Sequence, residues 1–335
     1  MLKSVVRRPP KRHVRDDGWR LPDALWAKMQ RLLPARPEHP LGCHNPRVPD
    51  RAAMDAIFFV QRTGCQWNAL RETTICSSSS AHRRFQEWVT AGVFAAFWRK
   101  GLLAYDAVQG IEWDWLALDG AMGKAPLGRE KTGPNPTDRG KRGVKRSILT
   151  DGRGVPLGAV IDGANRNDHK LMRQTIEAIP IKRPKPTRRR PQHLCLDKGF
   201  DYDEPRALAT AFGFTLHLRT RGEEAQAKRH AGAKARRWVV ERTHSWLNRF
   251  RSVLIRWAKK PANYLALLHF ACAIITWRHA HPEAMNCTEG TTKSRVSRAR
   301  RSLRIMLLGN EGQSCRTAGH TGARSTDHPA EQTRS

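Results

Sequence analysis

Residues 112–120 read EWDWLALDG and residues 193–199 read HLCLDKG, and these two stretches decide the fold of the second half of the chain. Each is a short apolar run that ends in an aspartate and reaches a glycine within two residues, which is typical of a buried strand that stops at a turn. Either motif alone is most often only a turn. However, side chains at the carboxyl ends of neighbouring strands project into one crevice beyond the sheet. We therefore predict that Asp119 and Asp197 lie together, where they could share a divalent cation.

A third carboxylate, Glu241, lies in a segment with helical spacing. The apolar residues of 234–257 recur at about 100° per residue and predict one long amphipathic helix, whose aromatic arc, including Trp238 and Trp246, faces the sheet. Glu241 falls near the edge of that arc, one turn after Arg237, which could pair with the carboxylate or hold a phosphate. The alternative is an exposed ion pair that only decorates the helix.

Three clustered carboxylates raise one another's pKa unless cations neutralise their charge. Asp119, Asp197 and Glu241 therefore predict a site for Mg²⁺ or Mn²⁺, which prefer hard oxygen ligands. Two such ions about 3.5–4 Å apart could activate a water or a 3′-hydroxyl and stabilise the leaving oxygen during phosphodiester cleavage.

The segments around these residues alternate between strand and helix periods, which indicates an α/β domain over residues 106–280. Asp151-Gly152-Arg153-Gly154 lies between two β-rich runs and predicts a hairpin. Residues 180–192 hold four prolines, six basic residues and no acid, so they are predicted to form a loop. The remaining predicted elements are a loop over 121–142, helices over 167–179, 204–212 and 264–277, and a strand over 215–218.

The chain carries 61 Lys and Arg against 30 Asp and Glu, a formal net charge of +31 over 335 residues. Such a charge attracts polyanions by releasing their counterions, so DNA is the expected partner, and Arg188, Arg189 and Arg190 are expected to contact its backbone. A membrane is not expected, because the longest apolar run, 264–277, is shorter than the ~20 residues of a spanning helix. Seven cysteines without a Cys-x-x-Cys pair indicate free thiols in a cytoplasmic protein, and a zinc site on Cys43, His44, Cys65 and Cys76 is the alternative.

The first part of the chain has the pattern of a small helical domain. Residues 1–15 hold six basic residues and no acid, which is typical of a basic arm. Residues 16–105 then predict short helices, one beginning at Asp50 and ending before Gly64, and another capped by Ser77 to Ser80. His82, Arg83 and Arg84 lie in the first turns of the latter, which is the layout of a helix-turn-helix that contacts DNA. An ordinary helical bundle with a basic face is the alternative.

Together these blocks resemble the DDE transposases encoded by bacterial insertion sequences of the "insertion sequence five" family. The resemblance covers about residues 20–280 and is carried by LDGAMGKAPLG, by GPNPTDRGKRGVKRSILTDGRGVPLGAVIDGANRND, by HLCLDKGFDYDE and by the stretch from RRWVVERTHSWLNRF onward. It implies a ribonuclease H-like fold with Asp119 on the first strand, Asp197 on the fourth and Glu241 on the following helix. The family's helix signature contains, in order, a tyrosine, an arginine, a glutamate and a final basic residue. Arg237 and Glu241 match its arginine and glutamate. Lys234 stands at the tyrosine position and Asn248 at the last basic position, with Arg249 beside it.

We therefore expect an α/β protein, a ribonuclease H-like catalytic domain preceded by an all-α helix-turn-helix domain. The expected activity is metal-dependent cleavage at insertion-sequence ends and strand transfer into target DNA, by a homo-oligomer on DNA in the bacterial cytoplasm, associated with the nucleoid. A hydrolysis-only nuclease and a DNA-binding regulator are the rival interpretations. Residues 281–335 are poor in large apolar groups and predict a disordered tail.

Overall fold

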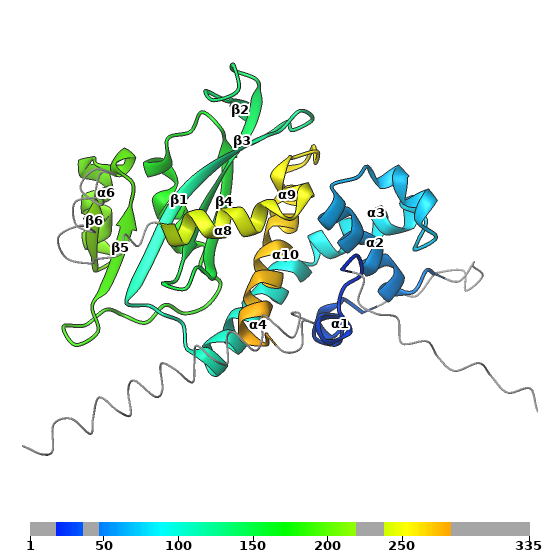
Figure 1. Cartoon of the computed structure of the whole chain (residues 1–335), viewed down its shortest axis with the longest axis horizontal. Coiled ribbons are helices and arrows are strands. Elements are labelled where there is room, and N and C mark those ends of the chain that lie inside the picture. The colour runs from blue at the N-terminus through cyan, green and yellow to red at the C-terminus, as the bar shows by residue number, and fades with distance from the viewer. Residues whose placement is uncertain (1–17, 36–46, 219–237, 283–335) are drawn as a thin grey trace, which may run out of the picture. The chain divides into compact units, whose positions relative to one another are not determined.

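The computed structural model describes residues 18–35, 47–218 and 238–282 (Figure 1). The predicted basic arm, Arg237, Cys43, His44 and nearly all of the predicted tail lie outside these residues. Within the described part, Cys65 and Cys76 are free thiols. The same residues contain no helix with the length and apolar character needed to cross a membrane.

The N-terminal region is helical, as predicted. Gly64 ends the second helix with a φ of 69°, a conformation that favours glycine. The Ser77 side chain caps α3 (Ser78–Thr90) by accepting a hydrogen bond from the Ser80 amide at 3.3 Å. The elements are α1 (Asp23–Met29), η1 (Gln30–Leu32), α2 (Asp50–Thr63), η2 (Trp67–Thr73), α3 (Ser78–Thr90) and α4 (Val93–Gln109).

The second region is built on one mixed sheet. Its long strands are β1 (Trp115–Lys124), β3 (Arg142–Thr150), β4 (Pro156–Gly163), β5 (Gln192–Leu196) and β6 (Phe214–Leu218), and β2 (Gly133–Pro134) is a short edge piece. The long strands lie in the order β4-β3-β1-β5-β6. The first three in the chain pair antiparallel, and β5 and β6 continue the sheet in parallel with β1. This order and these directions define a ribonuclease H-like fold, and the predicted hairpin joins β3 to β4.

Helical segments connect and cover the strands. They are η3 (Asp168–Leu171), α5 (Met172–Glu177), η4 (Lys198–Phe200), α6 (Asp203–Ala211), α8 (Trp238–Asn248), α9 (Arg251–Leu254) and α10 (Pro261–Ala280). Figure 1 shows α8 crossing the sheet over β1 and β3, and α10 running beside α4.

The prediction of one long helix over 234–257 is wrong, because the described residues form two helices, α8 and α9. Phe250 adopts an extended conformation (φ −92°, ψ 97°) between α8 and α9. The chain after α9 then joins the end of β1, where Ile255 bridges Lys124 and the Arg256 amide donates to the Lys124 carbonyl at 2.8 Å. A straight helix could not reach that strand, so pairing with β1 overrides the local helical pattern.

The two regions share a hydrophobic core. Phe270 of α10 is fully buried, and its ring centroid lies 6.1 Å from that of Phe58 on α2 and 5.3 and 6.4 Å from those of Phe94 and Phe97 on α4. Trp98 of α4 also donates to the Pro156 carbonyl of β4 at 3.2 Å. The boundary between residues 105 and 106 therefore runs through continuous packing, and the division into two domains there stays a prediction.

The β3–β4 turn predicts a pH-dependent stability. The buried Asp151 carboxylate accepts hydrogen bonds from Tyr105, Val155 and Arg153 at 2.8–3.0 Å, and burial raises the pKa of Asp151 to about 6. The folded chain thus favours the protonated acid, so this stabilisation is present below the unfolded pKa and is lost as the pH rises from about 4 to about 6. We expect Asp151→Asn to flatten the change of unfolding free energy over that window, by up to about 3 kcal/mol. Urea unfolding at pH 4.5 and pH 7 measures this, and an identical pH dependence in both chains would contradict it.

Candidate active site

Strand register places the two predicted aspartates level with each other. β1 and β5 pair in parallel through Ala117 and Cys195, the last of their paired residues. Asp119 and Asp197 are each two residues further along. β5 ends at Leu196, whereas β1 continues to Lys124 and stays paired with β3. The prediction that the first strand stops at Asp119 is therefore wrong, and Asp119 instead lies where β1 loses its neighbour on the β5 side and the sheet opens.

Local contacts fix the backbone at both aspartates. Asp197 caps η4 by accepting a hydrogen bond from the Lys198 amide at 2.6 Å. Next to Asp119, a Cβ atom on Gly120 would lie 1.7 Å from an Asp168 carboxylate oxygen, so a larger residue there would displace that carboxylate. The other Asp168 oxygen accepts a hydrogen bond from the buried Lys145 at 3.0 Å. Neither residue of this pair has a local sequence signal, because the two residues meet only through the fold.

Helix α8 carries Glu241 on an exposed position. Its buried residues are Val239, Val240, Thr243, His244 and Leu247. Thr243 donates to the Gly154 carbonyl at 2.6 Å, which ties the helix to the β3–β4 turn. In the described part of the chain no three His, Cys, Asp or Glu side chains gather closely enough to hold a metal ion. Glu241 therefore does not close a cluster with the two aspartates in this structure.

Trp238, at the start of the predicted aromatic arc of α8, does not face the sheet. Trp238 is 45% exposed, and its ring and that of Trp246 lie 4.5 and 4.7 Å from the Arg242 guanidinium. Trp238 lies at the surface with this cation–π contact, whereas Trp246 is half-buried and its ring also lies 5.1 Å from that of His279. The smaller residues of the helix can therefore approach β1 and β3.

A neutral histidine lies beneath Glu241, beside β1. Burial, reinforced by the charge of Arg146, lowers the pKa of His244 to about 3. Arg146 itself is buried and donates to Asn248 at 2.9 Å and to the Val253 carbonyl at 3.2 Å. Asn248 stands at the position where the family carries a basic residue. It accepts a hydrogen bond from Arg146, so the positive charge near this position comes from β3. Neighbouring Arg249 is exposed.

The helix-turn-helix candidates on α3 separate into two groups. His82 and Arg83 are exposed, and the His82 ring lies edge-on to Trp67 at 5.1 Å. Arg84 is buried on the helix face that packs inward, where it pairs with Asp50 and Glu87. Arg84 is therefore not expected to contact DNA, because its charge is paired within the α2–α3 packing.

The cationic segment 180–192 is a loop, as predicted, until β5 begins at Gln192. Thr187 and Arg190 close a tight turn through two backbone hydrogen bonds of 3.1 Å, with Arg188 and Arg189 at its tip. All three arginines are exposed. Arg183 anchors the base of the loop by donating to Gln192 and to the Phe212 carbonyl, both at 2.7 Å.

Comparisons with known proteins agree with this architecture. Residues 21–98 match the family model described as "Putative transposase of IS4/5 family", and residues 116–276 match "Transposase DDE domain". A Burkholderia cepacia protein described as "Putative transposase for insertion sequence element IS402" is 41% identical over 162 residues, which is 45% of this chain and 70% of the relative. A second protein of that organism, "Insertion element IS402 uncharacterized 16.2 kDa protein", is 33% identical over 118 residues, 34% of this chain and 79% of the relative.

Solved structures with similarity include the Mos1 strand transfer complex, with a TM-score of 0.29 at 11% identity, covering 75% of this chain and 78% of that one. The pre-cleavage Mos1 transpososome has a TM-score of 0.25 at 12% identity, covering 76% and 83%. The strand order and strand directions, rather than these similarities, define the fold of this chain.

Fold and family models together define a nucleic-acid enzyme of the ribonuclease H-like class. The chain belongs to the DDE transposases of the IS4/5 family. Its function is that of a transposase, an enzyme that acts on DNA with the help of divalent metal ions.

Proposed function

We propose that Asp119, Asp197 and Glu241 are the catalytic carboxylates of this transposase and that they hold two Mg²⁺ or Mn²⁺ ions. The observation that carries the proposal is the β1–β5 register, which brings Asp119 and Asp197 level where the sheet opens. Their donor chemistry also fits, since carboxylate oxygens are the ligands that these hard cations prefer. When bound, the ions activate a water or a 3′-hydroxyl and stabilise the leaving oxygen.

The residues of the chain hold the reacting groups in place. The parallel strands fix the spacing of the two aspartates, and the Lys198 amide orients Asp197. Glu241 is presented by a helix whose buried face is locked to β1, β3 and the Gly154 carbonyl. Because its side chain is exposed, Glu241 can meet the ions and the DNA from the solvent side.

Positive side chains elsewhere on the chain are proposed to hold the DNA. They are Arg237, Arg249, His82 and Arg83, together with Arg188, Arg189 and Arg190. The substrates are the terminal inverted repeats of the element and its target DNA, bound by a homo-oligomer at the nucleoid in the cytoplasm. An excess of cations is needed for this, because the carboxylate centre itself repels phosphates.

The test is a reaction on labelled DNA that carries the inverted repeats flanking the gene. We expect cleavage at the ends and joined products in Mg²⁺, with neither in EDTA. Cleavage without joining from a pre-cleaved end would favour the hydrolysis-only nuclease. End binding with no cleavage in any divalent metal, unaffected by chelation, would favour the DNA-binding regulator.

The cationic turn gives a separate prediction on affinity. Replacing Arg188, Arg189 and Arg190 by glutamine should weaken binding to element ends and to random duplex DNA alike, because phosphate contacts carry no base information. Each lost contact removes about 0.9 from the slope of log affinity against log salt, so the slope should flatten by up to about 2.7. Anisotropy titrations over a salt series measure this. An unchanged slope would remove the turn from the interface.

A further inference from the structure

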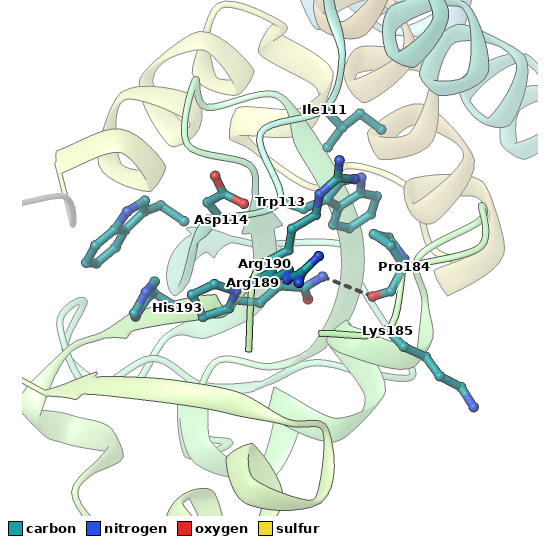
Figure 2. Close-up of a pocket in the computed structure, with 11 residues that line it drawn as sticks. Ile111, Trp113, Asp114, Pro184, Lys185, Arg189, Arg190 and His193 are labelled. Carbon is teal, nitrogen blue, oxygen red and sulfur yellow. Dashed lines mark hydrogen bonds between the residues drawn. The ribbon is translucent and has the colours of Figure 1, made fainter. Parts of the chain in front are cut away.

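A cleft lies at the end of β5 opposite to Asp197. It has a volume of about 460 Å³, within the ~300–1,000 Å³ of ordinary ligand sites. One wall comes from the segment that leads into β1, with Trp113 and Trp115, and the other from the cationic loop, with Arg189 and Arg190. In Figure 2 these two arginines lie between Trp113 and His193.

The aromatic side of the cleft is rigid. The His193 imidazole stacks on the Trp115 indole at 4.3 Å and 19°. His193 Nδ1 also shares a hydrogen bond of 2.9 Å with His217 Nε2 on the neighbouring strand. Gln192 ties the loop to this floor by donating to the Pro184 carbonyl at 2.9 Å. The Trp115 and His193 rings are therefore held in place before any ligand arrives.

The charge of the cleft selects an anion. Among the described residues that line it, Lys185, Arg189 and Arg190 are cations, and Asp114 is the one acid. Arginine offers a planar fork that matches phosphate oxygens. Flat rings beside such cations are the combination that binds an unpaired nucleotide, with its base on the rings and its phosphate on the arginines.

We infer that this cleft binds a single DNA strand, taking one unstacked nucleotide between the Trp113 side and the Arg189–Arg190 side. A duplex backbone would contact the exposed arginines but would leave the indoles unused, because its bases are stacked inside. The inference rests on the proposed action on DNA and deepens it.

The position of the cleft separates it from the cleavage centre. Trp115 and Asp119 are four residues apart on β1, as are His193 and Asp197 along β5, which corresponds to about 13 Å of strand. The nucleotide in the cleft is thus distinct from the phosphodiester at the aspartates. Asp119→Asn and EDTA leave the cleft intact, so binding can be measured without catalysis.

The experiment compares variants of the full chain for binding to fluorescent oligo(dT) and to a duplex of equal length, in EDTA. Stacking of one base on an aromatic side chain corresponds to about 1–3 kcal/mol, so Trp113→Ala should weaken oligo(dT) binding by about 5- to 160-fold. Duplex binding should change far less, and Trp113→Phe should restore most of the single-strand affinity. Equal losses for both DNAs, or no loss for oligo(dT), would overturn the inference.

A matched pair of arginines supplies the control. Arg188 and Arg189 are both exposed at the tip of one turn, but only Arg189 lines the cleft. Arg189→Gln should therefore weaken oligo(dT) binding several-fold more than Arg188→Gln, whereas general charge attraction predicts equal losses.

Photocrosslinking of iodouracil-substituted single strands, mapped by mass spectrometry, gives a readout that does not depend on folding of the variants. Crosslinks to 113–115 or to His193 are expected, and crosslinks confined to other peptides would contradict the inference. A chain that crosslinks at these residues but does not cut DNA would contradict the proposed function and not this inference. A chain that cuts DNA but does not crosslink at these residues would contradict this inference and not the proposed function.

Discussion

Asp119→Asn and Asp197→Asn should each lower end cleavage and strand transfer by orders of magnitude while DNA binding persists. Asparagine keeps the size and shape of aspartate but removes the negative charge that would hold a divalent cation. Binding should survive and could tighten slightly, because a negative charge near phosphate is gone. Labelled-end reactions in Mg²⁺ and gel shifts on the same preparations measure the two properties separately.

Glu241→Gln should behave like the aspartate variants. Asp203 and Asp162 supply the controls: Asp203 begins α6 at an exposed position, and Asp162 on β4 accepts a hydrogen bond from the Gly163 amide at 2.8 Å. Their asparagine variants should keep activity. Calorimetric titration with Mn²⁺ adds a readout besides activity, in which the three active-site variants should bind the metal more weakly. Cleavage by the aspartate variants, or equally inactive controls, would show that the active site lies elsewhere.

Phe270→Ala should lower the free energy of unfolding by about 3–5 kcal/mol, the usual cost of truncating a buried aromatic side chain. Phe270 lies where α10 meets α2 and α4, so its removal leaves a cavity bordered by Phe58, Phe94 and Phe97. Because these contacts join the N-terminal helices to the second region, both should lose stability together. Urea unfolding followed by far-UV circular dichroism and by tryptophan fluorescence measures the shift.

Two comparisons make the Phe270 result specific. Phe270→Leu retains most of the side chain and should cost much less than the alanine variant. Leu265→Ala, at a half-buried position of the same helix, should also have a smaller effect. If Phe270→Ala instead separates unfolding into two transitions with the helical region unchanged, then the shared core does not couple the two regions.

Much of the fold could be predicted because it follows from short-range rules. The Ser77 cap and the Gly64 helix end depend on backbone groups a few residues away. The β3–β4 hairpin depends on Asp151 and its neighbours. The Asp151 carboxylate accepts hydrogen bonds from backbone amides of its own turn. The charge of +31 and the two strand-end aspartates likewise required only composition and local pattern.

The residues of the candidate site could be proposed from the sequence, but their surroundings could not. Asp119 and Asp197 stood out because each follows an apolar run, whereas Lys145 and Asp168 showed no local signal, since they meet only when η3 packs beside β1 and β3. Arg84 had the spacing of a DNA contact but is buried against Asp50, which is distant in sequence.

Most of the elements, the fold class and the acidic residues of the candidate centre could therefore be inferred from the sequence, because periodic burial, caps and turns act over a few residues. The tertiary structure alone decided that β1 runs past Asp119, that the helix carrying Glu241 ends at Asn248, and that Trp113 and Arg189 line one cleft. Each of these depends on a partner far along the chain: β3 extends β1, Lys124 captures the segment after α9, and the loop before β5 folds back over the start of β1.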